Sequence, residues 1–301
     1  MVISMYQITR TGKTGTVLKQ NSVRLENGQE LEYLTFPALE ETGLVEHLIT
    51  TRLGGVSTGE LAAMNLSFTR GDREENVLEN YRRIAGVLGC GMGDMVASHQ
   101  THTVNIRHVT SADRGKGILK PRDYEDIDGL MTDESGIALV TFYADCVPLL
   151  FLDPVHRAVG LAHSGWRGTV GRMGKCMTEA MAETFGSKPS ELIAAIGPSI
   201  CQDCYEVGGE VAEQFWQMFG GREHCGGIVA PGKEEGKYQL DLWLANRLIL
   251  EEAGIPHNNI SVTDICTCHN SDYLFSHRGS GGRRGNLGVF LMLEPLLRKS
   301  S

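Results

Sequence analysis

The sequence has no hydrophobic run long enough to cross a membrane, and its N-terminus lacks the apolar core of a signal peptide. Its longest apolar stretch, residues 137–152, contains Asp145 and Pro148. Basic residues are also scarce, because 28 Lys and Arg stand against 37 Asp and Glu for a formal net charge of −9. Neither nucleic acid nor an anionic membrane surface is the expected partner of such a chain. We therefore expect a cytoplasmic protein.

Cysteine is too sparse for a disulfide framework, since the chain has eight in 301 residues. This usage suits a reducing compartment in which most thiols stay free. The sequence also shows no internal repeat, charge run, linker-like segment or low-complexity segment, which favours one domain and gives no support to an interaction module. An apolar content of 41% is enough for a substantial core.

Periodic patterns predict both helices and strands. Residues 1–36 alternate apolar and polar and contain Asn27-Gly28, a strong hairpin signal, so we expect a β leader packed on a catalytic domain of residues 37–301. Hairpins and parallel crossovers are mixed, which favours an α+β architecture with mixed sheets. The expected helices run from an Asp72 cap to Leu88, start after Gly168, and span about 209–219 and 241–253. The expected strands span 44–51, 137–142, 192–196, 260–265 and 288–293.

A central β-hairpin organises the chain. Two apolar runs, 147–152 and 158–161, flank Asp153-Pro154-Val155-His156, where proline suits a type I turn. If Asp153 pairs with His156, Cys146 lies opposite His163 with Cβ atoms roughly 4.5–5.5 Å apart on one face. A thiolate and an imidazole at that spacing could share one metal ion.

His102 is the third candidate ligand. It opens an expected strand in which it shares one face with Val104 and Ile106. Three mixed nitrogen and sulfur ligands with an open fourth position are typical of catalytic rather than structural zinc. The polar segment after this strand, residues 107–128, is expected to be a surface loop with little structure of its own.

A second group of residues competes for a metal. Cys201-x-x-Cys204 together with Cys266-x-Cys268-His269 could close a four-ligand structural site. The spacing of the second half does not match a zinc ribbon or finger. A thioredoxin-like redox pair fits less well, because Cys201 and Cys204 follow Gly-Pro at a strand end without the usual flanking context.

Two arginines mark candidate anion sites. Arg167 lies between two glycines just ahead of an expected helix that carries Met173 and Met177 at helical spacing, so free backbone amides accompany it. Arg52 stands at the start of the glycine-bearing loop 51–57. The plainer interpretations are a solvated loop charge for Arg52 and a surface arginine for Arg167.

A series of short motifs runs in order along nearly the whole chain. They are Thr51–Ser57, Asn65-Leu66, Gln100–His102, Ala144–Pro148, Ala162–Gly168, Ile196–Pro198, Tyr205–Val207 and Phe275-Ser276. Each motif is weak alone, but their order is specific. In them the sequence resembles a bacterial family described as peptidoglycan editing factors or multi-copper polyphenol oxidoreductases, and more recently as purine nucleoside phosphorylases.

The resemblance implies a fold of four layers, α/β/β/α, with mixed sheets. It implies that His102, Cys146 and His163 are the zinc ligands and form the catalytic centre. The activity implied is phosphorolysis of adenosine, inosine or methylthioadenosine to free base and sugar 1-phosphate, with adenosine deamination as a second activity. The expected partners are therefore a purine nucleoside and phosphate, and the expected state is a monomer or a weak homo-oligomer.

The chemistry of several residues in these motifs suggests substrate contacts. Arg167 and Arg52 could receive phosphate through charge-assisted hydrogen bonds. Asp145 could orient a ligand or the substrate, and Gln100 and Asn65 could contact base or ribose.

The sequence departs from the family pattern at three places. Thr69 stands where a histidine is common, and residues 283–286 replace a Thr-Gly-Arg motif, so no substrate role is carried over to them. Cys201 stands where the family often has glycine, which weakens the case for a structural site at the second cysteine group.

Two other enzyme functions compete. A copper polyphenol oxidase is suggested by one family description, and copper could occupy the site, but three ligands and ten histidines in all suit a multi-copper cluster poorly. A hydrolase acting in peptidoglycan precursor editing could instead use Cys146 as nucleophile and His163 as base. Metal bound through Cys146 would weigh against the hydrolase.

Overall fold

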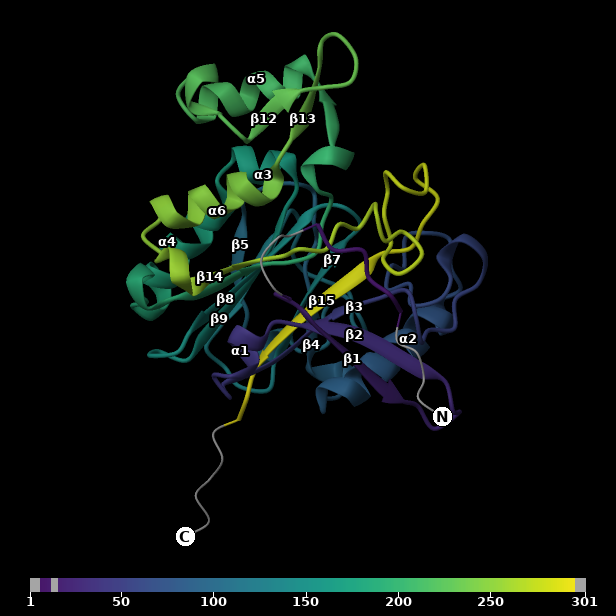
Figure 1. Ribbon diagram of the computed structural model, residues 1–301. Coiled ribbons are helices and arrows are strands. Elements are labelled where there is room, and N and C mark those ends of the chain that lie inside the picture. The colour runs from purple at the N-terminus through teal and green to yellow at the C-terminus, as the bar shows by residue number, and fades with distance from the viewer. Residues whose placement is uncertain (1–5, 12–15, 296–301) are drawn as a thin grey trace.

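The computed structural model describes residues 6–11 and 16–295. Two six-stranded mixed sheets lie face to face, and helices cover the outer face of each (Figure 1). The α+β fold with four layers, α/β/β/α, is therefore confirmed. Of the expected β leader, residues 1–5 and 12–15 lie outside the described residues.

The first sheet carries both the N-terminal strands and the last strand of the chain. Its only parallel pair within the described residues is β4 with β7, and the expected hairpin at Asn27-Gly28 is confirmed as the antiparallel pair of β1 and β2. In spatial order it contains β1 (Lys19–Arg24), β2 (Glu30–Thr35), β3 (Val45–Thr50), β15 (Leu287–Leu293), β7 (Ala138–Tyr143) and β4 (Met95–Ala97).

The second sheet contains the central hairpin. Two of its strand pairs, β10 with β14 and β5 with β6, are parallel. In spatial order it contains β14 (Ile260–Val262), β10 (Ile193–Ile196), β8 (Val147–Asp153), β9 (Ala158–Ser164), β6 (Gly129–Thr132) and β5 (Ile106–His108).

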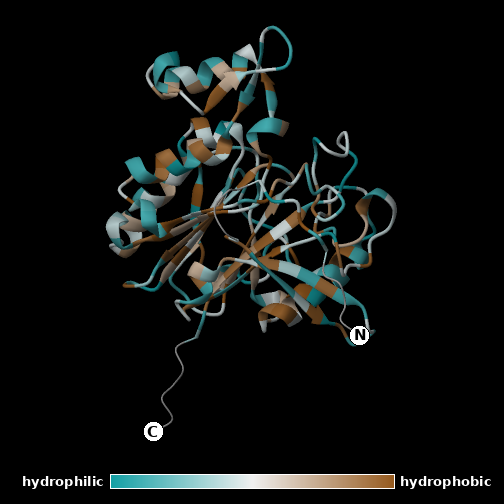
Figure 2. Ribbon diagram, in the orientation of Figure 1, coloured by the Kyte–Doolittle hydropathy of each residue, from teal (hydrophilic) through white to brown (hydrophobic). Residues whose placement is uncertain are grey.

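Alternation along the strands divides the core into layers, because successive side chains point to opposite faces of a sheet. In β8, Leu150 and Leu152 pack between the two sheets, whereas Leu149 and Phe151 pack against the helices on the outer face. Because both faces of β8 are covered, its sequence is a continuous apolar run. Figure 2 shows hydrophobic residues, in brown, along the strands of the sheets. Burial of each such side chain contributes roughly 1.5–3 kcal/mol.

The hairpin is confirmed, but its predicted register is wrong. Pro148, not Cys146, pairs with His163. The reason is the turn: four residues, 154–157, connect β8 and β9, and Arg157 takes a left-handed conformation with φ 53°. The two extra loop residues shift the pairing by two positions. Because side chains alternate with a period of two, Cys146 and His163 still share a face.

The helix expected after Gly168 is two helices, α3 (Trp166–Val170) and α4 (Met173–Phe185). The chain turns between them at Gly171 and Arg172, and Arg172 has φ 60°. A Cβ on Gly171 would lie 2.6 Å from Val104 Cγ1, so a side chain there would force Val104 to move. The methionines of α4 are fully buried in the core, as their spacing predicted.

The other helices follow the sequence pattern closely. α2 (Glu74–Leu88) covers the first sheet, and α6 (Leu242–Glu252) lies beside α4 on the second. α5 (Gly209–Met218) packs on a third sheet of three strands at one end of the molecule (Figure 1). That sheet has the order β11 (Glu206–Gly208), β13 (Lys237–Leu240), β12 (Val229–Pro231), and none of its three strands was predicted.

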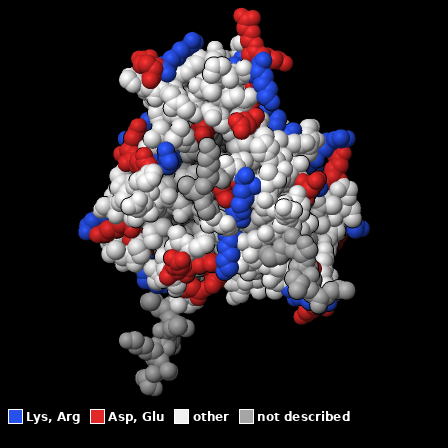
Figure 3. All heavy atoms as spheres, in the orientation of Figure 1, with Lys and Arg blue, Asp and Glu red and all other residues white. Residues whose placement is uncertain are grey.

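The remaining elements are short. α1 (Pro37–Glu40) follows β2. The 3-10 turns are η1 (Gly59–Leu61), η2 (Met92–Asp94), η3 (Ser111–Asp113), η4 (Pro189–Glu191), η5 (Gln202–Cys204), η6 (Arg222–His224) and η7 (His257–Asn259). Among the residues described, no helix has the length and apolar character needed to cross a membrane. Acidic and basic side chains are interspersed over the face shown in Figure 3.

One expectation about residues 98–128 is wrong, and another is confirmed only in part. His102 does not lie on a strand: it occupies the connection between β4 and β5 with φ 67°. The segment 107–128 is mostly loop, as expected, but it begins within β5, contains η3 and ends at Asp128, which is fully buried. Both differences involve Asp128, because the backbone at His102 bends to donate a hydrogen bond to this buried carboxylate.

Candidate active site

His102, Cys146 and His163 converge at one point. A nitrogen or sulfur atom from each lies within 4.8 Å of the others. The two imidazole rings are 4.9 Å apart between centroids and nearly perpendicular, at 80°. The three residues come from a loop, the residue before β8 and the end of β9, so the two sheets together bring them into contact.

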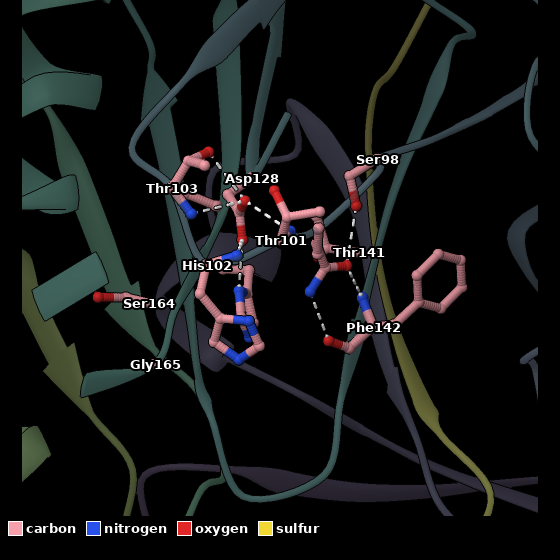
Figure 4. Close-up of polar contacts among 12 residues, drawn as sticks. Ser98, Thr101, His102, Thr103, Asp128, Thr141, Phe142, Ser164 and Gly165 are labelled. Carbon is pink, nitrogen blue, oxygen red and sulfur yellow. Dashed lines mark hydrogen bonds and ion pairs between the residues drawn. The ribbon is translucent and has the colours of Figure 1, made fainter. Parts of the chain in front are cut away.

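Asp128 connects two of these three residues. Its Oδ1 accepts a hydrogen bond from His163 Nδ1 at 2.7 Å and from the backbone N–H of His102 at 3.1 Å. Its Oδ2 accepts from the backbone N–H groups of Thr101 and Thr103 at 3.0 and 2.9 Å (Figure 4). With Nδ1–H held by a carboxylate, His163 presents Nε2 as its free donor atom. Asp128 was not predicted, because its position in the sequence shows only a polar residue before an apolar strand.

The charges of these groups depend on one another. Burial raises the pKa of Cys146, but the nearby His163 and His102 outweigh it and lower the pKa to about 6. Burial lowers the pKa of His163, yet the Cys146 sulfur and the Asp128 carboxylate raise it to about 9. Burial also raises the pKa of Asp128, which its hydrogen bond from His163 brings down to about 2. A thiolate at Cys146 is therefore the favoured form near neutral pH.

Gly165 keeps space open beside the donors. A Cβ at this position would lie 3.0 Å from Cys146 Sγ and 3.2 Å from His102 Cδ2. Any side chain at 165 would therefore push against both residues.

Two cavities meet at the candidate ligands. The first has a volume of about 370 Å³ and the second about 330 Å³, both within the range of small-molecule sites. They share His102, Ala144, Cys146 and Arg284 in their linings. A molecule that reaches from one cavity to the other must pass these residues.

The two cavities differ in chemistry. The first is lined by apolar and aromatic groups with a few polar ones: Trp166, Ile200, Tyr205 and Leu242, together with Asp145, His277 and Arg278. The second contains the guanidinium groups of Arg70, Arg122 and Arg284 and several hydroxyl and amide groups, including Ser67, Thr69, Ser98, His99 and Gln100. The first suits a planar ring and the second an anion.

Arg284 is the central cation of this site and was not predicted. Burial and then the charge of Arg70 lower its pKa to about 10, so it remains charged at neutral pH. Its Nη1 donates to Gly285 O and Asn286 Oδ1 in its own loop. Its Nε is buried and has no hydrogen-bond partner among the residues that the structure describes.

Asp145 and Gln100 line the cavities, but their polar atoms already have partners. Asp145 Oδ1 accepts from Thr267 Oγ1 at 2.6 Å, and Oδ2 accepts from the backbone N–H of Arg278 at 2.7 Å. Gln100 Oε1 accepts from the backbone N–H of Phe142, and Nε2 donates to the carbonyl of the same residue. Both side chains thus hold the cavity walls in place.

Arg52 and Asn65 lie outside the linings of both cavities. Arg52 donates to the carbonyls of Ala62 and Ser271 and stacks on Phe275, with its Cζ 4.8 Å from the ring centroid. Asn65 is fully buried and accepts the backbone N–H of Asn286, so it supports the loop that carries Arg284.

Arg167 is exposed and stacks on Trp166, with its Cζ 4.2 Å from the ring centroid. It is not among the residues that line either cavity, although Trp166 lines the first. Its guanidinium therefore lies near the rim of the first cavity.

The chain belongs to the family described as multi-copper polyphenol oxidoreductase laccase, whose model matches residues 46–294. It is 36% identical over 249 residues to purine nucleoside phosphorylase YlmD of Bacillus subtilis, covering 81% of this chain and 87% of the relative. It is 37% identical over 250 residues to a purine nucleoside phosphorylase of Deinococcus radiodurans, covering 83% and 89%.

A further relative carries a different activity in its name. Adenosine deaminase RL5, from an unknown prokaryotic organism, is 34% identical over 264 residues, covering 87% of this chain and 98% of the relative. Among solved structures, YlmD from Geobacillus stearothermophilus superposes with a TM-score of 0.80 at 34% identity, covering 87% of this chain and 96% of that one.

Proposed function

We propose that this protein is a zinc-dependent purine nucleoside phosphorylase that also deaminates adenosine. The relatives named above support the substrate class. The observation that carries the proposal is the convergence of His102, Cys146 and His163 where an aromatic cavity and a cationic cavity meet: His102 and Cys146 line both cavities, and His163 lines the second.

The first cavity suits the purine. Trp166 and Tyr205 offer aromatic faces for stacking, and Leu242 and Ile200 complete an apolar surface. His277, which is exposed at this cavity, can provide a hydrogen bond to a ring nitrogen or an exocyclic group.

The second cavity suits phosphate. Arg70, Arg122 and Arg284 can donate charge-assisted hydrogen bonds to its oxygens. In phosphorolysis a phosphate oxygen forms a bond to the anomeric carbon while the bond from that carbon to the base nitrogen breaks, and the released base gains a proton. The entering and leaving groups lie on opposite sides of the sugar. Separate cavities with the ribose at the shared wall fit this geometry.

The donor set fits zinc. Two imidazoles and one thiolate with an open fourth position match the pattern of catalytic zinc, three protein ligands of nitrogen and sulfur plus one open position, although copper accepts the same donors. Zinc held by His102, Cys146 and His163 would supply a Lewis acid beside the substrate. Asp128 would keep His163 oriented with Nε2 toward the ion, and Gly165 would leave room for it.

Product analysis tests the proposal. Purified protein is incubated with adenosine and with inosine, with and without phosphate, and the products are identified by mass. We expect adenine and ribose 1-phosphate only when phosphate is present, and inosine from adenosine in either buffer. Adenine released at equal rate without phosphate would mean hydrolysis, and no turnover of any nucleoside would refute the proposal. Oxidation of a phenol by copper-loaded protein without nucleoside turnover would favour the laccase description.

Neighbouring arginines provide a matched pair of variants. Arg284→Gln removes a cation of the cavity and should raise the KM for phosphate roughly ten- to a hundredfold, since charged hydrogen bonds contribute about 1.5–3 kcal/mol. Arg283→Gln removes an exposed arginine that pairs with Glu60, and it should leave phosphate dependence unchanged. Arg167→Lys in the same assay tests the anion site expected at the start of α3.

The same contacts favour one second candidate. Cys146, His163 and Asp128 form a chain of thiolate, imidazole and carboxylate, as in a cysteine hydrolase. The two functions differ in their response to metal. If zinc binds through the sulfur, zinc should protect Cys146 from alkylation by iodoacetamide and chelation should abolish nucleoside turnover. Rapid alkylation with zinc present would favour the nucleophile.

A further inference from the structure

A second cluster of metal-binding side chains lies apart from the wall shared by the two cavities. Donor atoms of Cys201, Cys204, Cys266 and His269 all lie within 4.8 Å of one another. Cys201 and Cys266 are buried, Cys204 is half-buried and His269 is exposed. All four lie outside the donor set of the proposed function.

The structure shows which residues of the second cysteine group lie close enough to share a metal ion, and their spacing differs from the one considered in the sequence. Cys201 directly precedes the turn η5 and Cys204 is its last residue, with the backbone N–H of Cys204 donating to the carbonyl of Cys201 at 3.1 Å. In the other half, Cys266 is grouped with His269, and Cys268 between them is not. Both halves therefore place two ligands three positions apart, a spacing common in structural zinc sites. The mismatch in spacing noted for Cys266-x-Cys268-His269 does not arise when Cys268 is not a ligand.

The distances suit a tetrahedral site. With zinc bonds of about 2.3 Å to sulfur and 2.0–2.1 Å to nitrogen, neighbouring donors in a tetrahedron lie roughly 3.5–3.8 Å apart. Cys201 Sγ and His269 Nδ1 are 3.9 Å apart. The backbone N–H of Cys201 also donates to Cys266 Sγ at 3.3 Å, a contact that stabilises a thiolate. Small side-chain rotations would complete the site.

We propose that Cys201, Cys204, Cys266 and His269 bind one zinc ion at a structural site. Three thiolates and one imidazole fill all four positions of tetrahedral zinc, so no position remains for a substrate. Thiolate-rich donors also select zinc over magnesium, calcium or manganese.

This site joins two walls of the first cavity. Ile200 and Tyr205 line the cavity from one segment, and His277 and Arg278 line it from the other. The two segments already meet where Arg278 Nη1 donates to the carbonyl of Cys204 at 3.3 Å. A shared ion would link segments far apart in the chain, and its binding energy would stabilise the folded state.

The segments also reach the candidate active site. The backbone N–H of Ile200 donates to the carbonyl of Asp145 at 3.0 Å, and Asp145 is next to Cys146. Loss of the second ion should therefore lower the melting temperature and raise the KM for the nucleoside more than it lowers kcat.

Two half-buried cysteines in these segments, Cys204 as a proposed ligand and Cys268 as a non-ligand, allow a matched test of the site. The protein is prepared with Cys146→Ser so that the first donor set is disabled, and zinc is counted by elemental analysis after dialysis against a chelator. We expect about one zinc per chain. Adding Cys204→Ser should remove it, whereas Cys268→Ser, the same change at another half-buried cysteine, should retain it. His269→Ala should make the ion removable by the chelator.

Cobalt substitution provides a second measurement that does not depend on zinc counts. Cobalt in the Cys146→Ser protein should show thiolate-to-metal charge-transfer bands, and these should weaken in the Cys204→Ser variant. Circular dichroism establishes that each variant is folded.

Three results would overturn the proposal: no zinc in the folded Cys146→Ser protein, zinc lost with Cys268→Ser but kept with Cys204→Ser, or a disulfide within the cluster in non-reducing peptide mapping. Failure of the proposed function is distinguishable, because zinc counts in this background do not depend on nucleoside turnover.

Discussion

Asp128→Asn tests whether one buried carboxylate organises the candidate active site. Asp128 accepts the Nδ1–H of His163 and the backbone N–H groups around His102. An asparagine has the same shape, but one end of its amide is a donor. Either His163 would turn its accepting nitrogen toward that donor, or a backbone N–H would lose its acceptor. In the first case the Nε2 of His163 carries the proton and cannot bind metal.

The magnitude follows from the carboxylate's own pKa. Its pKa of about 2, against an ordinary value of 3.8, means that its surroundings favour the ionised form by about 2 kcal/mol. A neutral asparagine would lose most of this favourable interaction between the carboxylate and its hydrogen-bond donors. Loss of a partner that orients a metal-binding histidine typically weakens metal affinity roughly ten- to a hundredfold, which is the same order.

The assay is zinc-dependent recovery of adenosine deamination in protein treated with a chelator. We expect Asp128→Asn to need at least about tenfold more free zinc for half recovery than the unmodified protein. The matched control is Asp126→Asn. Asp126 is exposed, and its carboxylate accepts the Thr101 hydroxyl at 2.7 Å. Its one hydrogen bond to a histidine among the described residues runs from its backbone N–H to His99 Nδ1 at 3.1 Å, and asparagine keeps that N–H. This variant should recover normally.

Two results would refute this reasoning. One is equal zinc dependence of Asp128→Asn and the unmodified protein, and the other is an equal loss in Asp126→Asn. Urea denaturation of the metal-free proteins separates a general loss of stability from a specific loss of zinc affinity.

The remaining predictions concern the pH dependence of stability at His47 and the room that Gly165 leaves beside Cys146. Burial lowers the pKa of His47 to about 4, and its Nε2 accepts the backbone N–H of Phe36. In the unfolded chain this histidine is protonated below about pH 6.5, whereas in the folded chain it is protonated only below about pH 4. The free energy of unfolding therefore falls as the pH drops from about 6.5 to about 4, by roughly 3 kcal/mol in all. Urea denaturation at several pH values should show this component lost in His47→Gln, and an unchanged pH dependence would contradict it. Gly165→Ala should weaken zinc-dependent activity by about tenfold or more, because its Cβ would crowd Cys146. Gly86→Ala, where a Cβ meets nothing within 4 Å, is the control, and equal activity of the two variants would count against the crowding.

Local patterns determined the elements of the fold. Apolar alternation and helical spacing located α2, α5, α6 and the hairpin of β8 and β9, because these patterns reflect which face of each element is buried. Patterns failed where burial is not periodic. The strands β11, β12 and β13 of the third sheet have only three or four residues each, too few to show a period, and were missed for that reason.

The sequence also determined the three candidate ligands of the active site as a set, but not how they meet. Cys146 and His163 share a face even though the predicted turn was two residues too short, since a shift of two preserves the face. The length of the turn between β8 and β9 depends on the left-handed conformation of Arg157, and no local sequence motif predicts that conformation.

Only the tertiary structure decided which other residues surround that set. Asp128 reaches His163, and Arg284 reaches the wall beside Cys146, across large separations in the chain. It also decided that His269 rather than Cys268 joins Cys266 in the second cluster. A sequence lists the chemical groups, but contacts between distant segments depend on how the two sheets pack, and no local periodicity encodes that packing.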